Sequence, residues 1–206
     1  KKKGIIYEVN KADLIKQNIL ALPEYIQKNT GEEIEVDDKT YSQLVREHRD
    51  LPEYIIEKLA KNSERNDYIV KEYLENRKKY GKTIIFADRW FQCVYIKEKL
   101  KELSNKHGIN IEVDAVYTHI DATPGTAEER NKRSTTENSE ILKKFKDNKI
   151  DVLLNVKMLT EGTDVPSVNT VFVTRQTTSS ILLTQMIGRA LRGKKAGGGE
   201  DKDKET

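Results

Sequence analysis

Two arginines in the last part of the chain have the type and spacing that suit phosphate binding. Arg189 and Arg192 lie three positions apart in residues 185–193 (QMIGRALRG), where apolar spacing predicts a helix over residues 179–191. Residues three apart share one helix face, and guanidinium groups form bidentate hydrogen bonds to phosphoryl oxygens. Gly188 supports this interpretation, because a glycine inside a helix costs about 1 kcal/mol and usually has a packing reason. The alternative is a solvated basic helix end.

A second segment, residues 159–166 (LTEGTDVP), follows an apolar run that predicts a strand. Ligands of open α/β sheets bind beyond the carboxyl ends of the strands, and we expect both this segment and residues 185–193 to lie there. Asp164 offers a carboxylate at that edge, and Gly162 permits tight backbone geometry. A turn with a helix-capping aspartate explains the same residues, so spacing alone leaves both interpretations open.

The elements that must position these segments are short apolar runs that alternate with helical patterns. Strands separated by helices of about ten to fifteen residues imply βαβ crossovers and a parallel sheet, and therefore an α/β fold. The expected strands are residues 83–87, 111–117, 150–156 and 168–173, and the expected helices between them are 90–104 and 137–147.

The first eighty residues predict a different organisation, with helices and loops in the place of a sheet. Gly81 would end the last of these helices. The expected elements are a strand at 4–9, a short helix at 11–20, a loop at 27–40, a helical region at 40–61 interrupted near Pro52, and a helix at 64–79.

Composition excludes several classes of protein. The net charge is only +3, with 37 basic and 34 acidic residues, which neither supports nor excludes a nucleic-acid partner. A single cysteine, Cys93, excludes a disulfide within the chain, and we expect it to be a small core residue. The three histidines lie far apart, so no metal site is expected. No apolar run approaches about 18 residues, so we expect no membrane contact and a cytoplasmic location.

Two short sequences imitate nucleotide-binding boxes. Gly81-Lys82-Thr83 resembles the end of a phosphate-binding loop, but Asn76 stands where that loop needs glycine and the predicted strand follows the tripeptide. We interpret it as a helix stop and a strand start. Residues 36–38 (VDD) are interpreted as a solvated loop. Because the chain begins without methionine and shows no phosphate-binding loop, we expect a fragment of a longer protein.

The boxes together resemble a known family. Residues 185–192 are similar to the QxxGRxxR box of superfamily 2 helicases, residues 159–166 to the preceding box, and residues 83–87 to the strand that opens the second motor domain. The chain thus resembles the C-terminal RecA-like (helicase C) domain of DEAD/DEAH-type helicases related to type I and III restriction motor subunits. The resemblance implies a RecA-like parallel sheet sandwiched by helices over 81–193. A linker strand and helical extension at 1–80 and a flexible tail at 194–206 would flank it.

The resemblance also implies roles for individual residues. Arg189 and Arg192 would be arginine fingers on the γ-phosphate of ATP, and Gln185 would help to position that phosphate or the attacking water. Gly162, Asp164 and Gly188 would contact the nucleotide. The nucleic-acid backbone would be contacted by Thr118, His119, Asn155, Lys157, Thr178 and Ser180.

Departures from the family pattern narrow the function. Val156 stands near a position where many relatives have Thr or Ser, and Met186 and Leu191 replace an Arg and a Gly of the DEAD-box form. These favour DNA translocation. The implied partners are DNA and an N-terminal RecA-like domain of the same polypeptide, which would hold most of the ATP and its Mg²⁺. The alternatives are a restriction-enzyme motor subunit and a non-catalytic nucleic-acid-binding module.

Overall fold

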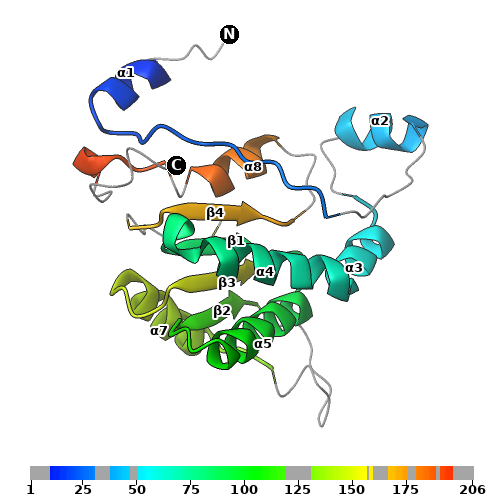
Figure 1. The fold of residues 1–206 in the computed structure, drawn as a ribbon. Coiled ribbons are helices and arrows are strands. Elements are labelled where there is room, and N and C mark those ends of the chain that lie inside the picture. Colours follow the sequence, from blue (N-terminus) through cyan, green and yellow to red (C-terminus); the bar gives the residue numbers. More distant parts are fainter. Residues whose placement is uncertain are drawn as a thin grey trace.

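The chain folds around one parallel sheet with helices on both faces (Figure 1). The computed structural model describes residues 10–30, 38–46, 51–118, 131–156, 158–159, 167–175, 180–188 and 191–196. Within these, four strands pair in the order β2-β3-β1-β4. Their bounds are β1 Thr83–Phe86, β2 Val113–Tyr117, β3 Val152–Val156 and β4 Thr170–Val173. All three pairings are parallel, so the predicted α/β class is confirmed.

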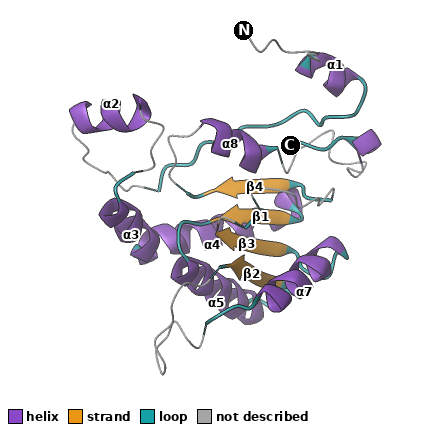
Figure 2. Cartoon of the chain, turned by 180° about the vertical axis from the view of Figure 1, so that it is seen from behind, coloured by secondary structure: helices purple, strands orange, loops and turns teal. Residues whose placement is uncertain are grey.

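Eight helical segments accompany the sheet in the described residues, and α5 and α7 connect its first three strands. Figures 1 and 2 show α4 and α5 on one face and α7 on the other. The bounds are α1 Lys11–Lys16, α2 Asp38–Arg46, α3 Glu53–Lys61, α4 Ser63–Tyr80, α5 Trp90–Lys106, α7 Thr135–Lys146, α8 Ser180–Ile187 and the 3₁₀ turn η1 Lys194–Ala196.

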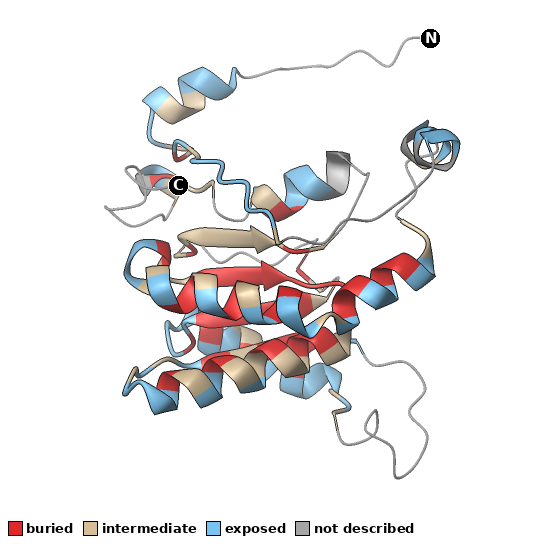
Figure 3. Cartoon of the chain, turned by 45° about the vertical axis from the view of Figure 1, so that its right-hand side comes forward, coloured by how far each residue is buried: buried red, intermediate tan, exposed pale blue. Residues whose placement is uncertain are grey.

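The alternation of side chains along the strands divides the core into two layers. Ile85 of β1 faces the layer formed with α4 and α5, whereas Ile84 and Phe86 face the layer that contains Phe145 of α7 and Met186 of α8. Figure 3 shows the buried central strands between these helices. Cys93 of α5 is completely buried in the first layer, as predicted, and burial raises the pKa of its thiol.

Helix ends follow local sequence signals. The Asn62 side chain accepts a hydrogen bond from the Arg65 amide at 2.7 Å and begins α4. Gly81 ends that helix with φ +54°, and a Cβ there would lie 3.0 Å from Oδ1 of Asn169. Thr83 then begins β1, so the interpretation of Gly81-Lys82-Thr83 as a helix stop and strand start is confirmed. A capping box between Ser134 and Glu137 begins α7.

Several predicted boundaries are wrong. The helical region 40–61 is interrupted near Pro52 as predicted, with Pro52 as the N-cap of α3, but α2 begins at Asp38 inside the predicted loop. The helix predicted over 11–20 ends at Lys16, because residues 18–21 pair with another part of the chain. The helix predicted over 179–191 ends at Ile187. The strand predicted at residues 4–9 lies outside the described residues.

Truncation of the second core layer tests this packing. Phe145 is fully buried, so Phe145→Ala is expected to lower the free energy of unfolding by about 3–5 kcal/mol through lost burial and a residual cavity. Urea denaturation of the chain measures the change. Lys144→Ala, at an exposed position next to it on α7, is the control and should change stability by less than about 0.5 kcal/mol. A Phe145→Ala loss below about 1 kcal/mol would contradict the described core.

Candidate functional site

Positive charge gathers where β1 and β4 end. The Arg89 guanidinium follows β1, forms an ion pair with Glu53 of α3, and donates to the Asp88 carbonyl oxygen at 3.2 Å. Burial, together with the nearby Arg175 after β4, lowers the pKa of Arg89. Arg65 of α4 is buried and donates to the carbonyl oxygen of Thr174. Three guanidinium groups therefore surround the carboxyl ends of these two strands.

A chain of buried amides fixes the carboxyl end of β1. Oε1 of Gln92 accepts from the Asp88 amide at 3.0 Å, and Nε2 of Gln92 donates to Oδ1 of Asn66 at 2.9 Å. Asn66 in turn donates to the Ala60 carbonyl oxygen at 2.9 Å. The network joins α3, α4 and α5 to the strand end. Asp88 itself is buried, at 3% exposure.

Sequence reasoning missed Arg65, Asn66 and Gln92. The signal was present, because Arg65 and Asn66 lie four residues before Ile69 and Val70 and so continue the buried face of α4. Polar side chains at such positions are buried only when they are hydrogen-bonded, and here they position the strand ends.

Asn155 has a positioning role that differs from the predicted one. Its side chain is completely buried at the end of β3, and Oδ1 accepts from the amides of Met158 and Leu159 at 2.9 and 3.1 Å. The carboxamide oxygen is therefore engaged with the main chain, and the contact of Asn155 with nucleic acid stays a prediction. The side chain shapes the start of the polar segment after β3, whose residues Gly162 and Asp164 lie outside the described residues.

The helix α8 separates the polar and apolar residues of the QMIGRALR box. Met186 is completely buried in the second core layer, whereas Gln185 beside it is exposed. Gly188 follows the helix, donating to the Thr184 carbonyl oxygen at 2.8 Å, and a Cβ on it would lie 3.1 Å from that oxygen. Gly188 thus ends the helix, where a helix-interior glycine had been expected.

The prediction that Arg189 and Arg192 share one helix face is wrong for Arg192. This residue lies beyond α8 and forms an antiparallel bridge with Leu20, while Arg189 lies outside the described residues. Figure 1 shows α8 running back along β4, away from the end where the strand arrowheads point. The end of the box therefore lies toward the amino end of β4, which corrects the expectation that it sits beyond the carboxyl end.

The remaining predicted contacts are only partly described. Thr118 is exposed directly after β2. Ser180 is the first residue of α8, and the positions of His119, Lys157 and Thr178 lie outside the described residues. In the part of the chain that the structure describes, no group of three His, Cys, Asp or Glu side chains could hold a metal ion. None of the described helices is long and apolar enough to cross a bilayer.

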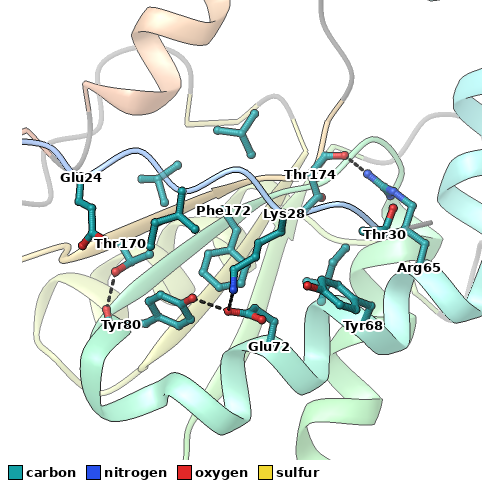
Figure 4. Close-up of a pocket in the computed structure, with 14 residues that line it drawn as sticks. Glu24, Lys28, Thr30, Arg65, Tyr68, Glu72, Tyr80, Thr170, Phe172 and Thr174 are labelled. Carbon is teal, nitrogen blue, oxygen red and sulfur yellow. Dashed lines mark hydrogen bonds and ion pairs between the residues drawn. The ribbon is translucent and has the colours of Figure 1, made fainter. Parts of the chain in front are cut away.

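A groove of about 260 Å³ lies between residues 24–30, α4 and the edge strand β4 (Figure 4). Glu72 stands in its middle, paired with Lys28 at 3.2 Å and accepting from the Tyr80 hydroxyl at 2.5 Å. The hydrogen bond from that hydroxyl is the main reason why the pKa of Glu72 lies below its usual value. Burial raises the pKa of Tyr80. The groove thus contains a polar network that attaches residues 24–30 to α4.

The parallel sheet and the residues of the box agree with one protein family. The model of the helicase conserved C-terminal domain matches residues 64–194, and the chain belongs to this family. The four-stranded parallel sheet with helices on both faces is its RecA-like core, and the predicted fold and family are confirmed.

Individual relatives carry helicase names. A Saccharomyces cerevisiae protein named as the ATP-dependent helicase IRC3 is 32% identical over 136 residues, which are 65% of this chain and 17% of that protein. A Schizosaccharomyces pombe protein named as the mitochondrial ATP-dependent helicase irc3 is 27% identical over 188 residues, 91% of this chain and 27% of the relative. The chain thus spans about a quarter or less of the length of these relatives.

Two solved structures are also similar. The Pyrococcus furiosus Hef helicase domain matches with a TM-score of 0.39 and 22% identity, over 73% of this chain and 25% of that one. A fragment described as the HsdR subunit of a type I restriction enzyme from Vibrio vulnificus YJ016 matches with a TM-score of 0.48 and 21% identity, over 73% and 26%.

The cap formed by Asn155 can be tested by truncation. Asn155→Ala leaves the Met158 and Leu159 amides without their acceptor, and a buried donor left unsatisfied costs about 1–3 kcal/mol. The expected result is that loss in urea denaturation together with faster hydrogen exchange at these two amides. Asn105→Ala, at an exposed position near the end of α5, serves as the control. Unchanged exchange at both amides in the Asn155 variant would refute the cap.

Proposed function

We propose that the chain is the second motor domain of an ATP-dependent DNA helicase or translocase. In this proposal the domain supplies arginine fingers to an ATP cleft and half of a nucleic-acid groove. Membership of the helicase C-terminal family supports it, and the names of both yeast relatives support dependence on ATP. The proposed boundaries remain 1–80, 81–193 and 194–206, although α4 packs into the core and the family match begins at residue 64.

The observation that carries the proposal is which residues of the QMIGRALR box α8 buries and which it exposes. Met186 packs in the core and Gln185 beside it is exposed. Gly188 ends the helix before the two arginines. Arg189 and Arg192 would then stabilise charge on the transferred phosphoryl group, and Gln185 would orient the attacking water. Gly162, Asp164 and Gly188 would contact the nucleotide.

In this proposal ATP and its Mg²⁺ are held mainly by the first motor domain, as the resemblance to the helicase family implies. ATP supplies the phosphoryl group, and this chain contributes positive charge and hydrogen bonds around it. The chain alone is therefore expected to turn over no ATP. Its location stays a prediction: composition favours the cytoplasm, and the name of the S. pombe relative offers the mitochondrion as the alternative.

Two alternatives remain. A motor subunit of a restriction enzyme would use this domain in the same way, and a nuclease domain elsewhere in the polypeptide would distinguish it. A non-catalytic nucleic-acid-binding module would keep the fold without needing Gln185, Arg189, Arg192 and Asp164 together.

The arginine roles are tested in the protein that contains both motor domains. Arg189→Ala or Arg192→Ala is expected to lower ATP turnover by about 10³–10⁵-fold while ATP binding survives. Steady-state ATPase assays and nucleotide titration measure the two effects. Arg46→Ala, on the exposed end of α2, is the control and should leave both unchanged. If Arg192→Lys kept full turnover, the bidentate role would be refuted, because lysine acts only as a point charge.

The nucleic-acid groove is tested by salt dependence. A motor that advances over any sequence should contact the repeating backbone, and the candidates here are mostly neutral donors such as Thr118 and Thr178, with Lys157. The chain is therefore expected to bind random DNA weakly, with a slope of about one or two counterions, and Lys157→Ala should lower that slope by about one. Lys106→Ala, at the far end of α5, is the control. A strong preference for one sequence, or a slope of about six, would contradict a backbone groove.

A further inference from the structure

The segment that contains Arg192 is held by main-chain hydrogen bonds to residues 18–21. The Ala21 amide donates to the Leu191 carbonyl oxygen at 3.0 Å, and the Gly193 amide donates to the Ile19 carbonyl oxygen at 3.0 Å. The Lys195 amide donates to the Asn18 carbonyl oxygen at 2.9 Å. Arg192 lies between these bonds, opposite Leu20 in the antiparallel bridge. We call this pairing of residues 18–21 with residues 191–195 the clamp.

Gly193 is required by the closeness of the two segments. A Cβ at this position would lie 2.5 Å from the Asn18 carbonyl oxygen and 3.0 Å from the Leu20 carbonyl carbon. Both neighbours are main-chain atoms, so they cannot turn away as a flexible side chain could. Asn18 itself has φ +58°, a left-handed conformation that asparagine tolerates better than most residues. Any side chain at Gly193 must therefore move the paired segments apart.

The clamp opposes a conformation that the local sequence favours. Arg189, Ala190, Leu191 and Arg192 all belong to residue types with high helix propensity, and only Gly188 separates them from α8. An extension of α8 through these residues would place Arg192 on the helix surface, as the sequence alone predicts. The clamp instead keeps residues 191–193 extended, and so determines where the backbone of Arg192 lies.

The clamp is continuous with the segment attached to α4. Glu24 pairs with Lys79 at 3.2 Å, and Lys28 pairs with Glu72 at 3.2 Å. Partly exposed ion pairs of this kind contribute little, so the main-chain bonds carry most of the positioning. Through these contacts the backbone of Arg192 is positioned relative to α4 as well as relative to α8.

From this geometry we propose that Asn18–Ala21 and Gly193 are positioning residues for Arg192. They keep its guanidinium at the distance from the ATP phosphates that the reaction needs, without touching the nucleotide. The inference rests on the proposed function, since it assigns a place in the same cleft. A displacement of about 1 Å is enough to lower turnover by about 10²-fold.

The experiment uses the protein that contains both motor domains. Gly193→Ala is expected to speed hydrogen exchange in residues 18–21 and 191–196, and to lower kcat by about 10²-fold with little change in the KM for ATP. Lys195→Pro, which removes one donor without a steric clash at Gly193, should give the same change in smaller degree. Gly108→Ala is the matched control: it places alanine at φ +64° with no atom within 4 Å, and should leave exchange in the clamp and kcat unaltered.

The outcomes separate the clamp from the function. If Gly193→Ala and Lys195→Pro open the clamp but keep kcat while Arg192→Ala abolishes turnover, the positioning role is refuted and the arginine role stands. If Arg192→Ala also keeps turnover, the proposed function of this arginine fails. If neither clamp variant speeds exchange, the pairing does not hold the segment and the inference is overturned.

Discussion

The alternation of side chains along the central strand β1 is the constraint on which the rest of the structure depends. Ile84 and Phe86 point to one layer and Ile85 to the other, and all three are almost fully buried. A strand of this kind needs parallel neighbours on both sides and helices on both faces. With this alternation, α4 and α5 pack on one side of the sheet and α7 and α8 on the other.

The buried polar groups fix the direction of the chain at the strand ends, which apolar packing alone does not specify. Apolar packing tolerates small shifts, whereas the hydrogen bonds of Gln92 to Asp88 and of Asn155 to Met158 and Leu159 have directions and short distances. Each joins the end of a strand to the residues that follow it. The loops thus leave the sheet in defined directions, which is what a site assembled from several loops requires.

The sequence predicted the sheet well because strands and crossover helices have strong periodic signals. Residues 83–86 and 152–156 form strands where the apolar runs lie, and Gly81 ends α4 through its positive φ. The end of α8 was not predictable in this way, since residues 189–192 favour helix by their types, whereas α8 ends before Gly188 and residues 191–195 pair with the distant residues 18–21. Arg65 was missed for a related reason: its burial depends on Thr174, which lies far along the chain.

The burial of Cys93 has a practical consequence for labelling this chain. The single thiol of the chain is inaccessible and held in its protonated form, and only the thiolate is nucleophilic. A cysteine introduced at an exposed position away from the proposed site, such as Asn105, would therefore react selectively with a maleimide fluorophore on this chain. Site-specific labelling of this chain needs no prior removal of its own cysteine.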